Sequence, residues 1–192
     1  MESVSPLRER KKAATRLSLH EAALRLAMAG GLDSVTIEDI ADSVGVSRRT
    51  FSNYFANKED AVLHADRERT HQMLDLVRRR PAAEKPWLAL RRAAGELYGH
   101  LTLPDPDWVA QLRLLRRHPS LLARQAADQM ALERDLAEVL LTRGDLDLEV
   151  ARLMAATFLA TVRTAGALWL EQAGEFALPD LIDRLLHRVR FH

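Results

Sequence analysis

The sequence of 192 residues contains no cysteine. Disulfide bonds and thiolate metal sites are therefore excluded. It also has no run of 18 or more apolar residues without a charge, because the longest candidate, residues 153–170, is interrupted by Arg163. A membrane-spanning helix is therefore not expected. The first 16 residues lack an apolar block after their charges, which argues against a signal peptide. We predict a cytoplasmic protein with no membrane partner.

Sequence patterns typical of enzymes are also missing. The chain has neither a nucleophile-elbow spacing nor a glycine-rich phosphate loop. His64, Glu68 and His71 are spaced to share one helix face, followed by Asp75, and such a set can bind a divalent metal. A charged surface is the more frequent reason for this pattern. We predict no catalytic residue, no metal site and no cofactor, and keep a helical metal-dependent enzyme as an unlikely alternative.

The net charge of +1 does not by itself favour nucleic acid. The distribution of charge is more informative than its sum. Between residues 8 and 16 there are five lysines or arginines and one acidic residue, Glu9. A charge run of this kind is usually a solvated helix face, and contact with phosphate groups is the alternative.

Turn-forming residues divide the sequence into helical lengths, and no convincing pair of strands is present. The pattern predicts an all-α fold with a compact N-terminal trio of helices, a connecting fourth helix and a larger bundle. The nine predicted helices span about residues 6–28, 37–44, 48–54, 58–80, 86–101, 108–117, 120–143, 148–172 and 178–190.

Two of these helices are short and lie in the stretch VTIEDIADSVGVSRRTFSNYFANKEDAV, residues 35–62. Isolated helices of this length are marginal in water. Two helices joined by a turn at Gly45 form the arrangement that places a second helix in the DNA major groove. A polar surface on an ordinary helical hairpin explains the spacing equally well. The basic start of the preceding helix favours DNA.

The side chains of the second short helix suit base recognition. Phe51 and Phe55 are four residues apart and can anchor the helix to a core. The polar residues between them then point outward, where arginine can pair with guanine and asparagine with adenine. The predicted base-facing residues are Arg48, Arg49, Ser52 and Asn53, and the residues with groups suited to phosphate are Thr50, Tyr54 and Lys58.

This stretch resembles the DNA-binding module of the tetracycline-repressor (TetR) family of bacterial regulators. The matching pattern is Thr36, Ile40, Ala41, Gly45, Val46, Ser47, Thr50, Tyr54, Phe55, Lys58 and Glu59. It covers about a quarter of the chain, whose length and helix count also match. At Ser52 the sequence departs from many relatives, which have an aromatic residue. The DNA-binding residues predicted with this resemblance are Arg10, Lys11, Thr36, Ser47, Arg48, Arg49, Thr50, Ser52, Asn53, Tyr54 and Lys58.

The resemblance implies a helix-turn-helix DNA-binding domain over residues 1–57 and a ligand-binding and dimerisation domain over 58–192, connected by helix 58–80. The second part resembles a TetR subgroup that binds acyl-CoA-like ligands, on Trp108, LRLLRRHPSL, Glu133, TRGDLD and Trp169. An acyl chain needs an apolar tunnel, and plain core packing is the alternative for each apolar residue. The predicted ligand-binding residues are Leu97, Leu101, Trp108, Leu112, Leu115, Arg116, Met130, Phe158 and Trp169.

Helices near 148–172 and 178–190 are the predicted homodimer contacts, with packing inside one subunit as the alternative. The predicted function is a dimeric repressor that binds double-stranded DNA and is released from a palindromic operator by a small amphipathic effector. The resemblance implies an acyl-CoA or another fatty acyl compound as this effector. A DNA-binding dimer without an effector remains the second hypothesis. The partner of Arg163 stays open between a pocket carboxylate, a ligand phosphate, an acidic group across the dimer and solvent.

Overall fold

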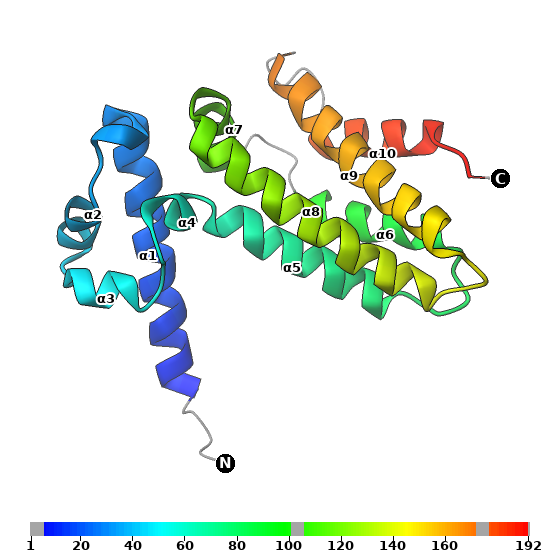
Figure 1. Ribbon diagram of the computed structural model, residues 1–192, viewed down its shortest axis with the longest axis horizontal. Coiled ribbons are helices and arrows are strands. Elements are labelled where there is room, and N and C mark those ends of the chain that lie inside the picture. Colours follow the sequence, from blue (N-terminus) through cyan, green and yellow to red (C-terminus); the bar gives the residue numbers. More distant parts are fainter. Residues whose placement is uncertain (1–5, 101–105, 172–176, 192) are drawn as a thin grey trace. The chain divides into compact units, whose positions relative to one another are not determined.

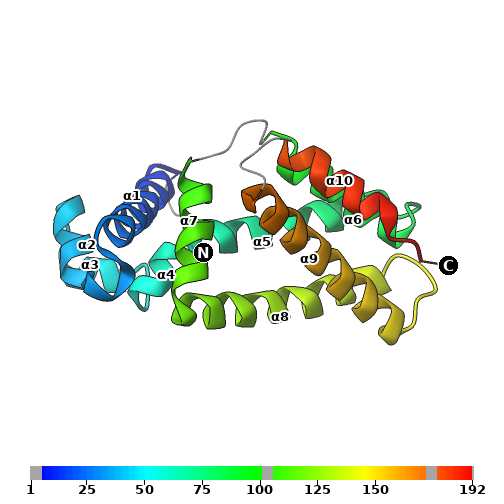
Figure 2. The same ribbon diagram turned by 90° about the horizontal axis from the view of Figure 1, so that it is seen from above.

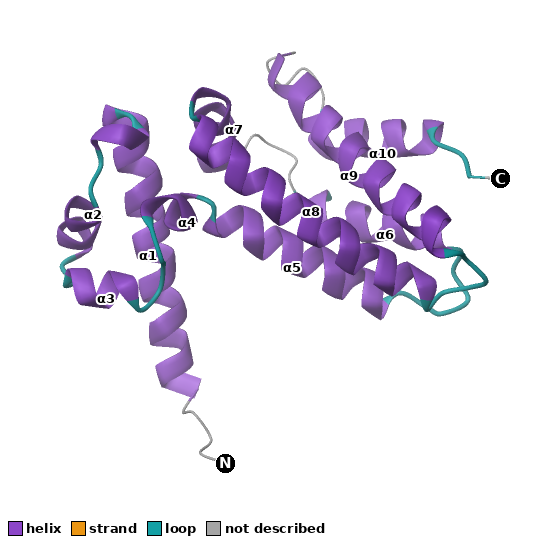
Figure 3. Cartoon of the chain, viewed as in Figure 1, coloured by secondary structure: helices purple, strands orange, loops and turns teal. Residues whose placement is uncertain are grey.

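The computed structural model describes residues 6–100, 106–171 and 177–191. These residues form ten α-helices and a 3-10 helix, with no strand among them, and the prediction of an all-α fold is confirmed (Figure 3). The bounds are α1 Pro6–Gly30, η1 Leu32–Ser34, α2 Ile37–Val44, α3 Arg48–Ser52, α4 Lys58–Val62, α5 His64–Arg79, α6 Pro86–Tyr98, α7 Pro106–Arg117, α8 Pro119–Leu141, α9 Leu148–Glu171 and α10 Leu178–Arg188.

The helix count differs from the prediction at one place. The single helix predicted over 58–80 is two helices, α4 and α5, separated by Leu63. Leu63 has φ −86° and ψ 4°, and its side chain is buried in a core. No glycine or proline marks this position, so the sequence carries no local signal for the break.

The chain divides into two compact units. The first comprises Met1–Asp66 and Ala110–Arg124, and the second comprises Arg67–Val109 and Gln125–His192. These units are defined by packing within the chain. The predicted division into a DNA-binding domain, residues 1–57, and a ligand-binding and dimerisation domain, residues 58–192, concerns function and stays a prediction.

The first unit is organised around α1. This helix packs against α2 and α4, and α2 packs against α3 (Figure 1). The end of α7 and the start of α8 add three leucines to the same core. Its largest buried side chains include Leu19, Leu32, Ile40, Phe51, Leu63, Leu114, Leu115 and Leu121.

In the second unit, α10 packs against both α9 and α6 (Figure 2). The core also takes apolar residues from α5 and α8. Among the described residues, α9 is the one helix long and apolar enough to cross a membrane by length and composition, yet its buried side chains, including Phe158 and Trp169, belong to this core. We interpret α9 as a core helix with a second, less buried apolar side.

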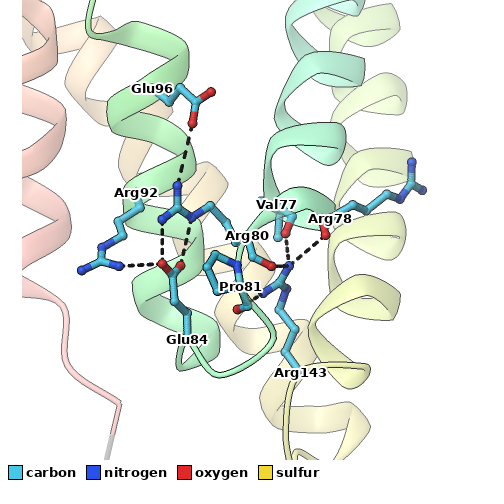
Figure 4. A network of polar contacts seen from close by, with 8 residues as sticks. All are labelled: Val77, Arg78, Arg80, Pro81, Glu84, Arg92, Glu96 and Arg143. Carbon is cyan, nitrogen blue, oxygen red and sulfur yellow. Dashed lines mark hydrogen bonds and ion pairs between the residues drawn. The ribbon is translucent and has the colours of Figure 1, made fainter.

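A buried arginine closes the C-terminal end of α5 (Figure 4). Arg143 follows α8, and its guanidinium donates hydrogen bonds to the backbone carbonyls of Val77, Arg78, Arg80 and Pro81. The last carbonyls of a helix have no partner within the helix and carry partial negative charge. Arg143 therefore satisfies these acceptors with a charge of favourable sign.

Glu84 lies in the loop that follows and is 8% exposed. Its carboxylate accepts hydrogen bonds from Arg80 at 3.0 and 2.6 Å and from Arg92 at 2.5 Å (Figure 4). The hydrogen bonds from Arg80 are the main reason that the pKa of Glu84 is lowered from 4.5 to about 2, against the opposing effect of burial. The charged form is therefore favoured by the fold.

The lowered pKa of Glu84 predicts a pH dependence of stability. A carboxyl whose pKa is lower in the folded than in the unfolded state stabilises the fold above the unfolded pKa, 4.5, and this contribution is lost as the pH falls towards 2. We expect Glu84→Gln to lower the melting temperature at neutral pH and to make it depend less on pH between about 5 and 2. Thermal unfolding followed by circular dichroism measures both.

Glu96→Gln is the matched control, because Glu96 also faces Arg80, at 3.8 Å, but its side chain is 59% exposed. We expect it to keep the wild-type pH dependence. Equal behaviour of the two variants would contradict the assignment.

Candidate nucleic-acid interface

The first helix of the pair, α2, begins with a capping box. The Thr36 hydroxyl accepts a hydrogen bond from the Asp39 backbone N–H at 3.1 Å, and the Asp39 carboxylate accepts one from the Thr36 N–H at 2.9 Å. The Thr36 hydroxyl also donates to this carboxylate at 2.6 Å. This hydroxyl, and then the Thr36 backbone N–H, hold the pKa of Asp39 below its usual value. The reciprocal bonds fix where α2 begins.

The turn between α2 and α3 depends on Gly45. Its φ of 72° and ψ of 33° lie in the left-handed region, which residues with a side chain rarely adopt. The Gly45 N–H bonds back to carbonyls of α2 and ends that helix. Two residues later, Ser47 caps α3 by accepting a hydrogen bond from the Thr50 N–H at 3.1 Å. The turn is therefore tight and determined by local sequence.

Burial of one side orients α3. Phe51 is fully buried and Phe55 is 7% exposed, and their ring centroids are 5.7 Å apart. The helix has only five residues, so this packing determines its position. The four predicted base-facing residues, Arg48, Arg49, Ser52 and Asn53, are all exposed.

The other predicted DNA-binding residues of this region are also described. Thr36 and Ser47 are exposed, and Thr50 and Tyr54 are half-buried. All of these residues belong to the first unit and lie on α2, α3 or at their ends. Their contact with DNA stays a prediction.

Arg48 has a partner that the sequence analysis did not predict. Its Nη1 atom donates to Oε1 of Glu38 at 2.7 Å, and the two side chains are 68% and 51% exposed. Glu38 lies on α2, ten residues earlier, so the turn at Gly45 is what brings the pair together. A spacing of ten residues between two opposite charges does not by itself indicate an ion pair.

The basic part of α1 extends past α3 in Figure 1. Residues 7–14, which include Arg10 and Lys11, are all exposed. One turn further on, the Arg16 guanidinium lies 5.9 Å from the centroid of the Tyr54 ring, within range of a cation–π interaction. Arg16 thus connects the basic segment to the end of α3.

Lys58 has a structural role in addition to the predicted phosphate contact. Its Nζ atom donates to the backbone carbonyls of Leu32 at 2.8 Å and Val35 at 2.9 Å. Both acceptors belong to the segment between α1 and α2. The lysine therefore holds this connection against the start of α4. The acceptors are 23 and 26 residues away, and no sequence signal indicates them.

The predicted ligand-binding residues are divided between the two cores. Leu97, Phe158 and Trp169 are buried in the second unit, whereas Leu115 is buried and Leu112 half-buried in the first. Met130 is 63% exposed. Leu101 and the side chains of Trp108 and Arg116 lie outside the described residues. The described members of the set therefore belong to two different units, and their contact with a ligand stays a prediction.

Two pockets of the second unit are lined mainly by polar residues. One, of about 240 Å³, is lined by Gln72, Asp75, Leu76, Arg79, Glu96, Leu97 and His100. The other, of about 290 Å³, is lined by Arg78, Asp135, Glu138, Val139, Thr142 and Arg143. Pockets for drug-sized ligands span roughly 300–1,000 Å³. Among the described residues, Leu97 is the one predicted ligand residue that lines either pocket.

The metal alternative rested on His64, Glu68 and His71. Within the residues that the structure describes, no group of three histidine, aspartate or glutamate side chains is placed to hold a metal ion. His64 instead packs its ring edge against His20 and Phe55, at centroid distances of 5.7 and 5.5 Å.

Comparison with known proteins identifies relatives for both parts of the chain. The family model described as bacterial regulatory proteins, tetR family, matches residues 19–65, and the model described as MftR C-terminal domain matches residues 84–191. The HTH-type transcriptional regulator TcmR of Streptomyces glaucescens is 33% identical over 172 residues, which are 85% of this chain and 76% of TcmR.

Solved structures show the same fold. The fatty acid degradation regulator FadR of Bacillus halodurans matches with a TM-score of 0.61 at 20% identity, over 90% of this chain and 98% of its own. FadR of Thermus thermophilus, a TetR-family repressor in complex with lauroyl-CoA, matches with a TM-score of 0.60 at 23% identity, over 92% and 97%. FadR of Bacillus subtilis in complex with stearoyl-CoA has a TM-score of 0.57 at 21% identity, over 89% and 95%.

The hydrogen bonds of Lys58 predict a loss of stability for Lys58→Met. Methionine keeps an apolar stem but removes the ammonium, which leaves the carbonyls of Leu32 and Val35 without this donor. We expect unfolding to become easier by about 1–3 kcal/mol. Chemical denaturation without DNA measures it. Lys11→Met is the control, because Lys11 is exposed on α1, and a loss of similar size there would contradict the structural role of Lys58.

Proposed function

The chain belongs to the TetR family of bacterial regulatory proteins, and from this premise we propose that it is a dimeric repressor released from a palindromic operator by a small amphipathic effector. Membership follows from the family match over residues 84–191, more than half of the chain, and from the 33% identity to TcmR. The chain is accordingly a DNA-binding transcriptional regulator with a helix-turn-helix domain and a C-terminal ligand-binding domain, and not an enzyme.

One observation carries the DNA-binding part of the proposal: α3 buries Phe51 and exposes Arg48, Arg49, Ser52 and Asn53. We propose that this exposed side enters the major groove. Arginine can donate two hydrogen bonds to guanine O6 and N7, and asparagine can pair with adenine N6 and N7. A helix that reads the major groove requires a buried apolar side that anchors it and an opposite polar side that contacts the bases.

Phosphate contacts would then position α3 on the duplex. Thr36, Ser47, Thr50 and Tyr54 carry hydroxyl groups around the helix pair, and such groups commonly bond phosphate oxygens. The exposed basic segment 7–14 of α1, with Arg10 and Lys11, supplies cations for phosphates beyond the helix pair. Binding to the bacterial chromosome also implies the cytoplasmic location that we propose.

The dimer part rests on the outward side of α9 and on α10. On α9, Leu153 is 58% exposed, and Ala156 and Ala160 are half-buried. Small residues allow another helix to approach closely, and an apolar side that is only partly covered within one subunit gains by burial against a second copy. We propose that α9 and α10, which correspond to the helices predicted near 148–172 and 178–190, form the homodimer contact. A twofold axis then requires a palindromic site with half-sites about one helical turn apart.

The effector part is supported by likeness of fold. The FadR structures in complex with lauroyl-CoA and stearoyl-CoA share this fold, and we propose an acyl-CoA or another fatty acyl compound as the effector. We propose that the effector binds most tightly to a conformation in which the two α3 helices of the dimer are spaced wrongly for the operator. A ligand that binds this conformation more tightly shifts the population towards it, and the shift lowers operator affinity.

Substitutions on α3 test the DNA-binding proposal. We expect Arg49→Ala and Asn53→Ala each to weaken binding to the operator by roughly 1–3 kcal/mol, with little change on random duplex. Fluorescence anisotropy with DNA from the upstream region of the gene, located by footprinting, measures both affinities. The control is Arg25→Ala, because Arg25 is an exposed arginine of α1 that is not among the predicted DNA contacts. The bound complex should contain two protomers per palindrome.

Equal losses on operator and random DNA would reassign Arg49 or Asn53 to phosphate contact. Unchanged affinity in both variants would contradict the placement of α3 in the groove.

Adding a candidate effector tests whether it releases the protein from the operator. We expect saturating lauroyl-CoA or stearoyl-CoA to lower operator affinity by about 5–150-fold, the usual range of allosteric coupling, and free CoA to leave it unchanged. Mass spectrometry of the purified protein identifies a co-purifying acyl compound, which is tested in the same way. Operator affinity that no such compound changes would favour the second hypothesis, a DNA-binding dimer without an effector.

A further inference from the structure

We propose that Glu38 is a specificity-determining residue of the DNA-binding surface, through its ion pair with Arg48. The inference rests on the proposed function and adds to it a residue that was not among the predicted DNA contacts. In this proposal Glu38 orients the Arg48 guanidinium towards one base pair and opposes binding to DNA on which that guanidinium finds no acceptor.

The pair lies at the junction of the two short helices. Glu38 is on the first turn of α2 and Arg48 is the first residue of α3, and their Oε1 and Nη1 atoms are 2.7 Å apart. The side chains are 51% and 68% exposed, so the pair is on the surface. Other contacts position the two helices: the Thr36–Asp39 capping box fixes the start of α2, and the burial of Phe51 fixes α3. The ion pair is therefore not needed to hold the backbones of the two residues near each other.

Stability of the fold is a weak explanation for this ion pair. Exposed salt bridges contribute little to the free energy of unfolding, because solvent screens the charges. The capping box and the Gly45 turn already fix the ends of α2 without Glu38. The ion pair is therefore better explained by what it does to the side chain of Arg48, a residue whose neighbours on α3 face solvent.

The remaining donors of Arg48 suit a base edge. A guanidinium has five N–H donors in a planar fork, and Glu38 is bonded to Nη1. The other edge remains for a two-bond contact with guanine O6 and N7. An arginine side chain loses rotamer entropy when it is immobilised, so one that is already held loses less on binding. Glu38 therefore lowers the cost of the specific contact.

The Glu38 carboxylate also weakens binding to random DNA. Non-specific binding comes almost entirely from cations that neutralise phosphates. A glutamate beside α3 adds repulsion from the phosphates and partly neutralises Arg48. On the operator the repulsion is offset by the oriented base contact, whereas on random DNA it is not. Discrimination then arises from both an attractive and a repulsive element.

The test compares Glu38→Gln with wild type on the footprinted operator, on operators with each base pair substituted, and on random duplex at one salt concentration. We expect Glu38→Gln to lower the ratio of operator to random affinity about 5–10-fold, with part of the change a gain on random DNA. The selectivity should be lost at the same base pair as in Arg48→Ala. In an Arg48→Ala background, Glu38→Gln should cause no further loss of selectivity at that pair.

Asp42→Asn is the matched control, since Asp42 is an exposed carboxylate one turn further along α2. It should raise affinity for operator and random DNA alike and leave their ratio unchanged. Thermal unfolding of each variant verifies that the fold is retained.

Two results would overturn the inference. The ratio of operator to random affinity could stay unchanged in Glu38→Gln, and an equal rise of both affinities would mean that Glu38 only withholds Arg48 from DNA. Alternatively, Asp42→Asn could lower the ratio as much as Glu38→Gln does. Failure of the proposed function is recognised separately, because Arg49→Ala and Asn53→Ala would then also leave operator binding unchanged.

Discussion

Burial of Phe51 is the interaction on which the DNA-binding surface depends. A helix of five residues cannot persist alone, and α3 exists because this side chain is fully enclosed by the core built on α1. Replacing such a phenylalanine by alanine typically costs about 3–5 kcal/mol. The same burial determines which side chains face solvent, so one apolar contact sets both the position of α3 and the orientation of its polar groups.

The helix pair could be predicted from the sequence because its determinants are local. The Thr36–Asp39 capping box, the left-handed Gly45 and the Ser47 cap are each settled within three or four residues. The amphipathic spacing of Phe51 and Phe55 is equally local. The break at Leu63, the Lys58 bonds and the Glu38–Arg48 pair were not predicted, because each depends on where distant segments meet.

For the predicted ligand-binding residues, by contrast, local sequence signals were not sufficient. An apolar residue at helical spacing has the same sequence signature whether it lines a cavity or fills a core. Leu115 and Phe158 were grouped by this signature, yet they belong to different cores, and Met130 is mostly exposed. Helix bounds in this part were predicted closely, since prolines and glycines mark them. The same signals do not indicate which side chains lie in the same core.

The guanidinium of Arg143 has a mechanical consequence for α5. It is bonded at once to four successive or nearly successive carbonyls, so the end of α5 and the residues after α8 behave as one rigid piece. Sliding α5 by a single residue is a 1.5 Å translation, enough to break these bonds. A shift of the end of α5 along its axis therefore either carries the residues after α8 with it or loses these hydrogen bonds.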